Sequence, residues 1–228
     1  MEKFRPDFVL IDLDGTLVDS VPDLTFCVDE MMKALGLPER GEAAVRNWVG
    51  NGVPKLVARA LTNSMEDEPD PELYKKALAI FEDLYRENTS QRSRVYPGVF
   101  EGLDWMRDNG YRLGCVTNKA EQFTLKLLED KELRPYFEVV VSGDTCANKK
   151  PDPEPLLYAA EQMGVTPDHA LMLGDSKSDV KAARAAGYHI ICVSYGYNHG
   201  EDIRDYQPDA VIDSFAELSD YLKAKDEA

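Results

Sequence analysis

The feature that most constrains the fold is a regular alternation, from residue 97 onward, of short apolar stretches with longer amphipathic ones. The apolar stretches favour strands and the amphipathic stretches favour helices. A continuous apolar run, Phe8–Ile11, is also typical of a strand buried on both faces. Because strands and helices that alternate in this way form parallel sheets with right-handed crossovers, we predict an α/β fold with a Rossmann-like core. The expected strands are 8–11, 111–117, 137–142, 170–174, 189–193 and 210–212, and the expected helices are 99–109, 120–130, 153–163, 177–186 and 215–222.

A helical segment interrupts this pattern after the first strand. Apolar residues recur with helical spacing over about 22–61 and again over about 71–87, and no strand is expected between residues 17 and 94. A chain of 228 residues is long for one domain and short for two. We therefore predict a Rossmann-like core made of residues 1–16 and 95–228, with a helical cap domain, residues 17–94, inserted into it.

The charge balance is strongly acidic, with 26 Lys and Arg against 42 Asp and Glu and a net charge of −16. Such a chain repels the phosphate backbone of nucleic acid and anionic membrane surfaces, so we expect neither as a partner. It would also repel a small phosphorylated metabolite unless local cations outweigh the global field. A divalent metal ion is the candidate for that role.

The cysteines and the hydropathy pattern bear on the compartment. Cys27, Cys115, Cys146 and Cys192 form no C-x-x-C pair and lack the spacing of a zinc site or a disulfide framework, which favours free thiols and a reducing environment. The first twenty residues contain no apolar run of secretory length, and no stretch is long enough for a transmembrane helix. We expect a cytoplasmic protein, and leave open whether it is a monomer or a homodimer.

Polar clusters stand where three of the predicted strands end: Asp12–Thr16, Thr117–Asn118 and Gly174–Asp175. A fourth cluster, Lys149–Pro151, precedes a predicted helix. Each alone has an ordinary reading as a turn, a helix N-cap or a surface charge. The carboxyl ends of parallel strands open onto one crevice. The occurrence of all four polar clusters in this order therefore indicates that they form one site.

Four motifs of the sequence, Asp12–Asp19, Thr117–Asn118, Lys150–Pro151 and Gly174–Asp179, resemble those of the haloacid dehalogenase-like hydrolase superfamily, over nearly the whole chain. The helical segment then resembles the cap of that superfamily. Within it, Trp48–Val53 is similar to the cap loop of bacterial phosphoglycolate phosphatases. The resemblance therefore implies a phosphatase with a capped Rossmann-like core.

The resemblance also implies roles for the acidic residues. Asp12 would attack phosphorus and form an aspartyl-phosphate, and Asp14 would serve as general acid and then as general base. Asp12, the backbone carbonyl of Asp14 and Asp175 would hold Mg²⁺, whose charge offsets the repulsion between a carboxylate and a phosphate dianion. Asp179 would orient the metal or its waters without binding the ion directly.

The remaining site residues would bind the substrate. Thr117 and Asn118 would donate hydrogen bonds to the phosphoryl oxygens, and a lysine would neutralise the charge on Asp12 and the phosphoryl group. We assign that role to Lys150, which directly precedes the motif's proline, and leave open whether Lys149 contributes.

In the cap, the loop Gly50, Asn51 and Gly52 precedes a predicted helix whose free N–H groups could bind an anion and set substrate specificity. Lys55 or Arg59 on that helix could add positive charge.

We therefore predict a Mg²⁺-dependent phosphomonoester hydrolase, with 2-phosphoglycolate as its expected substrate. A sugar phosphomutase similar to β-phosphoglucomutase, or a phosphatase of broader range, is the alternative, because these share the core residues and differ in the cap. Asp14 argues against a dehalogenase, which lacks an acidic residue at that position and protonates no alkoxide. A phospho-accepting receiver module is a remote alternative, which Asp14 and the inserted segment also disfavour.

Overall fold

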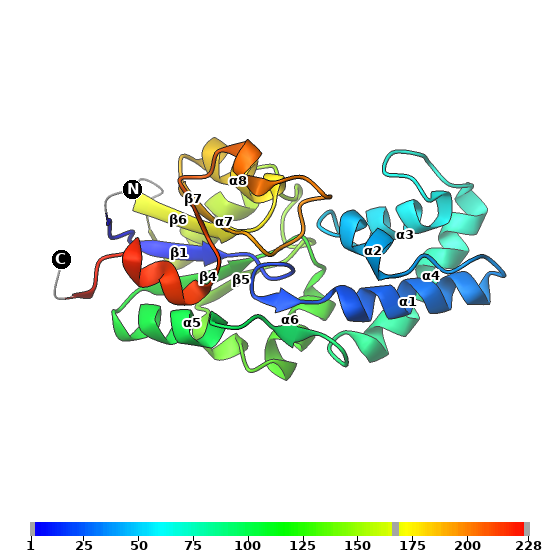
Figure 1. The fold of residues 1–228 in the computed structure, drawn as a ribbon, viewed down its shortest axis with the longest axis horizontal. Coiled ribbons are helices and arrows are strands. Elements are labelled where there is room, and N and C mark those ends of the chain that lie inside the picture. The colour runs from blue at the N-terminus through cyan, green and yellow to red at the C-terminus, as the bar shows by residue number, and fades with distance from the viewer. Residues whose placement is uncertain (1–2, 166–168, 226–228) are drawn as a thin grey trace.

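Six parallel strands form a sheet in the order β5-β4-β1-β6-β7-β8 in the computed structural model (Figure 1). The structure describes residues 3–165 and 169–225, so the ends of the predicted core, residues 1–2 and 226–228, lie outside the described residues. The predicted α/β architecture is confirmed. The strands are β1 Phe8–Ile11, β4 Arg112–Val116, β5 Val139–Val141, β6 Ala170–Gly174, β7 His189–Val193 and β8 Ala210–Ile212.

The centre of the sheet is β1, which pairs with β4 on one side and β6 on the other. Its last residue, Ile11, lies opposite Cys115 of β4 and Leu173 of β6, so the three strands end at nearly the same level. These are the strands that precede Asp12, Thr117 and Asp175. The register therefore brings the three polar clusters to one edge of the sheet.

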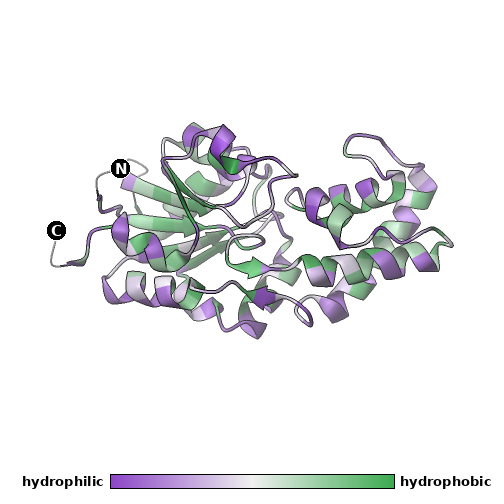
Figure 2. Ribbon diagram, viewed as in Figure 1, coloured by the Kyte–Doolittle hydropathy of each residue, from purple (hydrophilic) through white to green (hydrophobic). Residues whose placement is uncertain are grey.

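Helices cover both faces of the sheet. Alternate side chains of β1 enter different hydrophobic clusters: Val9 and Ile11 pack on one face with α5 and α6, and Phe8 and Leu10 on the other with α7 and α8. Figure 2 shows the strands as apolar and the helices as mixed in hydropathy, as expected for a covered sheet. The helices of the core are α5 Val99–Asp108, α6 Glu121–Asp130, α7 Glu154–Met163 and α8 Lys177–Ala186.

The predicted helix at 215–222 is instead a 3-10 segment, η4 Phe215–Asp220, packed against α5. Phe215 and Leu218 are both fully buried and lie three residues apart, which is the spacing that a 3-10 turn places on one side. In the part of the chain that the structure describes, shorter 3-10 segments are η1 Arg134–Tyr136 and η3 Ile203–Tyr206.

The inserted segment forms its own group of helices beside the sheet (Figure 1). These are α1 Val21–Ala34, α2 Glu42–Trp48, α3 Val53–Thr62 and α4 Pro71–Asn88. Their apolar faces share one hydrophobic cluster, which Phe123 of α6 and Tyr197 also join. Among the described helices, including α4 with its 18 residues, none has the length and apolar character required to cross a bilayer.

Two short strands connect the helical group to the core, where no strand was expected. The strand β2, Val18–Asp19, pairs antiparallel with β3, Arg94–Val95. The expectation of no strand after residue 17 was wrong, because a two-residue strand is too short to show a periodic pattern. The predicted core and cap boundaries lie at these strands, and the division itself stays a prediction.

Candidate active site

A small pocket lies between the carboxyl edge of the sheet and the cap helices, with a cavity volume of about 40 Å³. The core lines it with Asp12, Asp14, Thr117, Asn118 and Lys119. The cap lines it with Leu24, Val49, Gly50, Gly52, Val53 and Leu56. The residues predicted from the ends of β1 and β4 thus meet the predicted cap loop in one place, whereas Asp175, predicted from the end of β6, lines a neighbouring pocket.

Asp12 is held in a fixed orientation at the end of β1. Its backbone N–H donates to the carbonyl of Leu173 at 2.9 Å, and its Oδ1 accepts from the N–H of Leu13 at 2.7 Å and contacts Lys150 Nζ at 3.0 Å. Burial raises the pKa of Asp12 to about 7, the charge of Asp179 adds to this, and Lys150 opposes it. No hydrogen bond to Oδ2 is found among the described residues, so this oxygen is available for attack.

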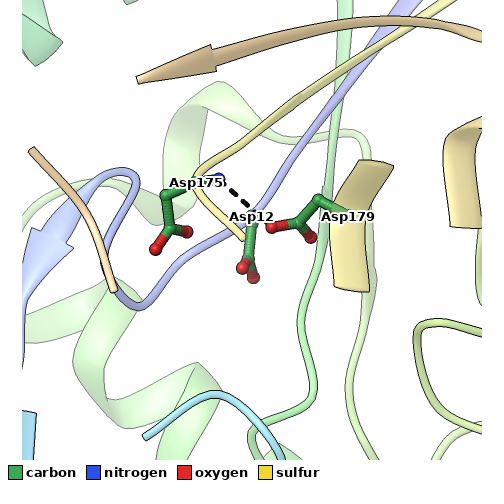
Figure 3. Close-up of side chains that lie close together, drawn as sticks. All are labelled: Asp12, Asp175 and Asp179. Carbon is green, nitrogen blue, oxygen red and sulfur yellow. Dashed lines mark hydrogen bonds between the residues drawn. The ribbon is translucent and has the colours of Figure 1, made fainter. Parts of the chain in front are cut away.

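Three carboxylates, those of Asp12, Asp175 and Asp179, converge with ligand oxygens within 4.8 Å of one another (Figure 3). Asp175 accepts hydrogen bonds from Thr16 Oγ1 at 2.7 Å and from the N–H of Tyr197 at 2.6 Å. Burial and repulsion from Asp179 and Asp12 raise the pKa of Asp175 well above its ordinary value. A buried set of oxygen donors with unfavourable mutual repulsion suits a hard divalent cation, so the cluster could bind a metal ion.

Asp179 differs from the other two because its oxygens already have several donors. Oδ1 contacts Lys150 Nζ at 2.8 Å, and Oδ2 accepts from the N–H of Asp175 at 3.1 Å and from Ser176 N and Oγ at 3.0 and 2.8 Å. With Ser176 it forms the capping box of α8. This bonding fits the predicted orienting role better than direct metal binding.

The two adjacent lysines lie in different environments. Lys150 is 1% exposed at its side chain, and its Nζ also donates to the carbonyl of Val116 at 2.7 Å. Burial disfavours its charge, but Asp12 and Asp179 outweigh burial and raise its pKa. Lys149 is half-buried, and no ion pair of its side chain is found in the described part of the chain. Its Nζ lies beside Gly52 of the cap loop, so the two lysines do not share one partner.

Gly15 allows the chain to turn sharply past Asp14, at φ +88°. A Cβ atom there would lie 2.3 Å from Asp175 Oδ2, so a side chain would displace the carboxylate. Only glycine meets both demands at this position.

Thr117 and Asn118 both reach the pocket, but the side chain of Asn118 already has partners. Thr117 Oγ1 accepts from the N–H of Lys119 at 3.2 Å. Asn118 Nδ2 donates at 2.9 Å to the carbonyl of Gly50 in the cap loop and at 2.9 Å to the carbonyl of Lys150. A contact between this amide and a phosphoryl oxygen would require one of these bonds to break.

Lys119 is a pocket residue that we did not predict from the sequence. Its Nζ contacts Asp14 Oδ1 at 3.0 Å and Oδ2 at 2.9 Å, and lies 5.0 Å from the centre of the Tyr85 ring. The available signal was its position directly after Thr117–Asn118, which places it at the same strand end. Asp14 therefore faces an ammonium group in this structure.

The cap loop presents backbone to the pocket. Gly50 and Gly52 have φ values of +121° and +86°, and α3 begins at the next residue, Val53. Gly50, Gly52 and Val53 line the pocket, whereas Asn51, between the glycines, is not among the lining residues. The N-terminus of α3 thus lies at the pocket, and its role as an anion site that sets specificity stays a prediction.

The cationic residues expected on α3 do not line this pocket. Lys55 is 58% exposed at its side chain and lies 3.6 Å from Glu68. Arg59 is buried and donates to the carbonyl of Trp48 at 2.6 Å. The expectation that either adds charge to the pocket finds no support, because both have partners within the cap.

A loop of the core after β7 also contacts the cap. His199 Nδ1 lies 2.7 Å from the carbonyl oxygen of Asn47, and the hydroxyl of Tyr197 donates to Asp19 in β2. Sequence reasoning gave this loop no role. Together with the Asn118–Gly50 bond, these contacts hold the cap against the core.

Residues 9–193 match the family model described as haloacid dehalogenase-like hydrolase. The chain is 62% identical over 218 residues to the phosphoglycolate phosphatase of Nitrosococcus oceani, covering 96% of this chain and 97% of that protein. It is 46% identical over 215 residues to the phosphoglycolate phosphatase of Nitrosospira multiformis, covering 94% and 95%. A solved structure described as a predicted phosphoglycolate phosphatase from Haemophilus somnus has a TM-score of 0.89 at 33% identity, covering 94% and 97%.

Proposed function

The chain belongs to the haloacid dehalogenase-like hydrolase family and is a phosphatase, and from this premise we propose that it hydrolyses 2-phosphoglycolate to glycolate and phosphate. The observation that carries the proposal is the fixed Asp12 carboxylate, which has one oxygen engaged by Lys150 and Leu13 and lies in a pocket closed by the cap. The 62% identity to a phosphoglycolate phosphatase supports this substrate.

We propose that Mg²⁺ is held by Asp12, Asp175 and the backbone carbonyl of Asp14. The bound ion would neutralise charge on the phosphoryl oxygens, which a carboxylate nucleophile otherwise repels. Lys150 adds a fixed positive charge beside Asp12. Asp179 keeps Lys150 and the start of α8 in place.

In the first step, Asp12 Oδ2 attacks phosphorus, and the bond between phosphorus and the glycolate oxygen breaks. Asp14 gives its proton to that oxygen, so that the leaving oxygen becomes the neutral hydroxyl group of glycolate. The phosphoryl group is now an acyl phosphate on Asp12. In the second step, Asp14 takes a proton from a water molecule that attacks phosphorus, and inorganic phosphate leaves with the Asp12 carboxylate restored.

The cap excludes bulk water during these steps. A cavity of about 40 Å³ holds about three water molecules, so substrate enters only when the cap moves away from the core. The bonds between cap and core that must break include those of Asn118 to Gly50 and of His199 to Asn47. Closing of the cap over bound substrate then completes the pocket.

The cap side of the pocket is lined by aliphatic side chains and glycine, which offer the sugar ring of the alternative substrates few hydrogen-bond partners. A small, soluble metabolite as substrate agrees with the cytoplasmic location that we propose. The net charge of −16 argues against nucleic acid as a partner.

A panel of phosphate esters assayed with Mg²⁺ tests the proposal. It should contain 2-phosphoglycolate, glucose 1-phosphate, nucleoside monophosphates and an aryl phosphate. We expect the highest kcat/KM for 2-phosphoglycolate. A higher value for glucose 1-phosphate, or similar values for all esters, would contradict the proposed substrate.

A further inference from the structure

The pocket contains one ion pair to which the reaction described above gives no role. Lys119 Nζ contacts both oxygens of Asp14, and the two side chains are only 4% and 14% exposed. Among the pocket-lining residues that the structure describes, Lys119 is the single cation. The cation that lines the pocket is therefore paired with Asp14, the proposed general acid and base.

This ion pair occupies Asp14 when no substrate is bound. A general acid must lie within hydrogen-bond distance of the oxygen that it protonates. Both oxygens of Asp14 contact the ammonium group instead.

Resting on the proposed function, we propose that Lys119 binds the carboxylate of 2-phosphoglycolate and thereby releases Asp14 to act on the leaving oxygen. In this substrate a single methylene group separates the leaving oxygen from the carboxylate. When the phosphoryl group lies against Asp12 and the leaving oxygen against Asp14, the cation beside Asp14 also lies beside the carboxylate. One carboxylate replaces another on Lys119, so its buried charge stays paired throughout. Asp14 is ionised in the ion pair, so on its release it takes up a proton from solvent, and this is the proton that it gives to the leaving oxygen.

The cap offers no competing cation in this pocket. Its lining residues are apolar or glycine, and Lys55 and Arg59 are engaged with Glu68 and with the carbonyl of Trp48. The N-terminus of α3 can add hydrogen bonds to the carboxylate from the opposite side. The full positive charge nevertheless comes from the core.

The exchange makes the substrate carboxylate part of the catalytic step as well as of binding. An ester without a carboxylate leaves Lys119 on Asp14, so the leaving oxygen has no proton donor at hand. Selectivity should therefore appear in kcat as well as in KM. A carboxylate site that only anchors substrate would change KM alone.

The first experiment compares 2-phosphoglycolate with ethyl phosphate, which has a similar size and an equally poor leaving group but no carboxylate. Lys119→Gln keeps a hydrogen-bond donor for Asp14 and removes the charge. We expect the ratio of the two kcat/KM values to fall on the order of ten-fold to a hundred-fold, the size of one charged hydrogen bond, with part of the loss in kcat. Lys126→Gln, on the exposed surface of α6 beside Asp130, is the matched control and should keep the wild-type ratio.

A wild-type ratio in folded Lys119→Gln would overturn the inference, and so would a loss confined to KM. If wild-type enzyme itself shows no preference for 2-phosphoglycolate, the proposed function fails first. The two failures are thus distinguishable from the same assay.

The second experiment does not depend on how Lys119 variants fold. A crystal structure of Asp12→Asn with 2-phosphoglycolate should place Lys119 Nζ about 3 Å from the substrate carboxylate, with Asp14 directed to the leaving oxygen. A structure in which Lys119 stays on Asp14 while the carboxylate binds elsewhere would refute the exchange.

Discussion

The two sides of the pocket are made of opposite kinds of residue. The core side consists of carboxylates, a lysine and short polar side chains, whereas the cap side consists of aliphatic side chains and glycine. The core residues follow the ends of adjacent strands, and the cap residues come from α1, α3 and the loop before α3. The core thus supplies the charged and polar groups of the pocket, and the cap supplies its apolar lining.

This difference predicts how substitutions on each side of the pocket affect activity. Core charges are buried and mutually paired, so removing one leaves another without a partner. Cap contacts are apolar or made by backbone, so changes there alter fit without leaving a charge exposed. We therefore expect losses of activity to be large on every substrate for the core residues that act on the phosphoryl group. Losses should depend on the substrate for Lys119, and should be smaller and substrate-dependent for cap residues.

The largest effect should come from Asp12→Asn, which removes the nucleophile. We expect kcat to fall by on the order of 10⁵-fold, in the range found when a catalytic nucleophile is deleted. Acid-quenched enzyme given labelled substrate should carry no phosphate on an aspartate. Asp14→Asn is the comparison, because it should slow both steps while still permitting some phosphorylation from esters with very good leaving groups. Labelled phosphate on Asp12→Asn would show that the nucleophile is another residue.

The second-largest loss of activity should follow removal of the metal ion, because the core side of the pocket then lacks the proposed Mg²⁺. Treatment with EDTA should lower activity at least about 10³-fold, since a Lewis acid contributes several kcal/mol to a transition state of this kind. Addition of Mg²⁺ should restore it, whereas Mg²⁺ should not rescue Asp175→Asn at the same concentration. Full activity in a rigorously metal-stripped sample would contradict the metal site.

Lys150→Met should have a smaller but still large effect on all substrates. It removes the charge that contacts Asp12 and Asp179, and we expect a loss in kcat of about 10²-fold to 10³-fold. The neighbouring Lys149→Met is the matched control, and its loss should be below about ten-fold because Lys149 contacts neither carboxylate. Thermal unfolding of both variants separates catalytic loss from loss of fold. Equal losses in activity for the two folded variants would show that we assigned the wrong lysine.

How much of this site could be predicted from sequence depends on the kind of contact. Asp12, Thr117 and Asp175 were predictable because each directly follows a strand, and parallel strands end at one edge. The contact of Lys119 with Asp14 joins residues 105 positions apart, and no local pattern encodes that distance. The bonds of Asn118 to two backbone carbonyls were missed for the same reason. The positions of the strand ends predict which residues lie at the site. Which of these side chains contact each other depends on tertiary packing, which the sequence pattern does not show.

The smallest effect should come from the cap loop, and it should depend on the substrate. Gly52→Val should cut kcat/KM for 2-phosphoglycolate by on the order of ten-fold more than for an aryl phosphate, the size of one charge-assisted contact. A Cβ atom at Gly52 would lie 3.0 Å from Lys149 Nζ and 3.3 Å from the carbonyl oxygen of Asn118, whereas at Gly50 the nearest atom is 3.8 Å away, in His199. Gly50→Val should therefore show the same preference with a smaller loss. Equal losses on both substrates would mean that the loop acts as a general lid.

The β2–β3 pair bears on how a protein of this kind could acquire new substrates. Because Val18 pairs with Val95 and Asp19 with Arg94, the chain leaves the core and re-enters it at adjacent points. Insertions are tolerated best where their two ends lie close together. A different insertion between these strands would keep the sheet, its register and Asp12 in place while replacing the entire apolar side of the pocket. One contiguous stretch of gene could thus be exchanged to recruit the same chemistry for another metabolite.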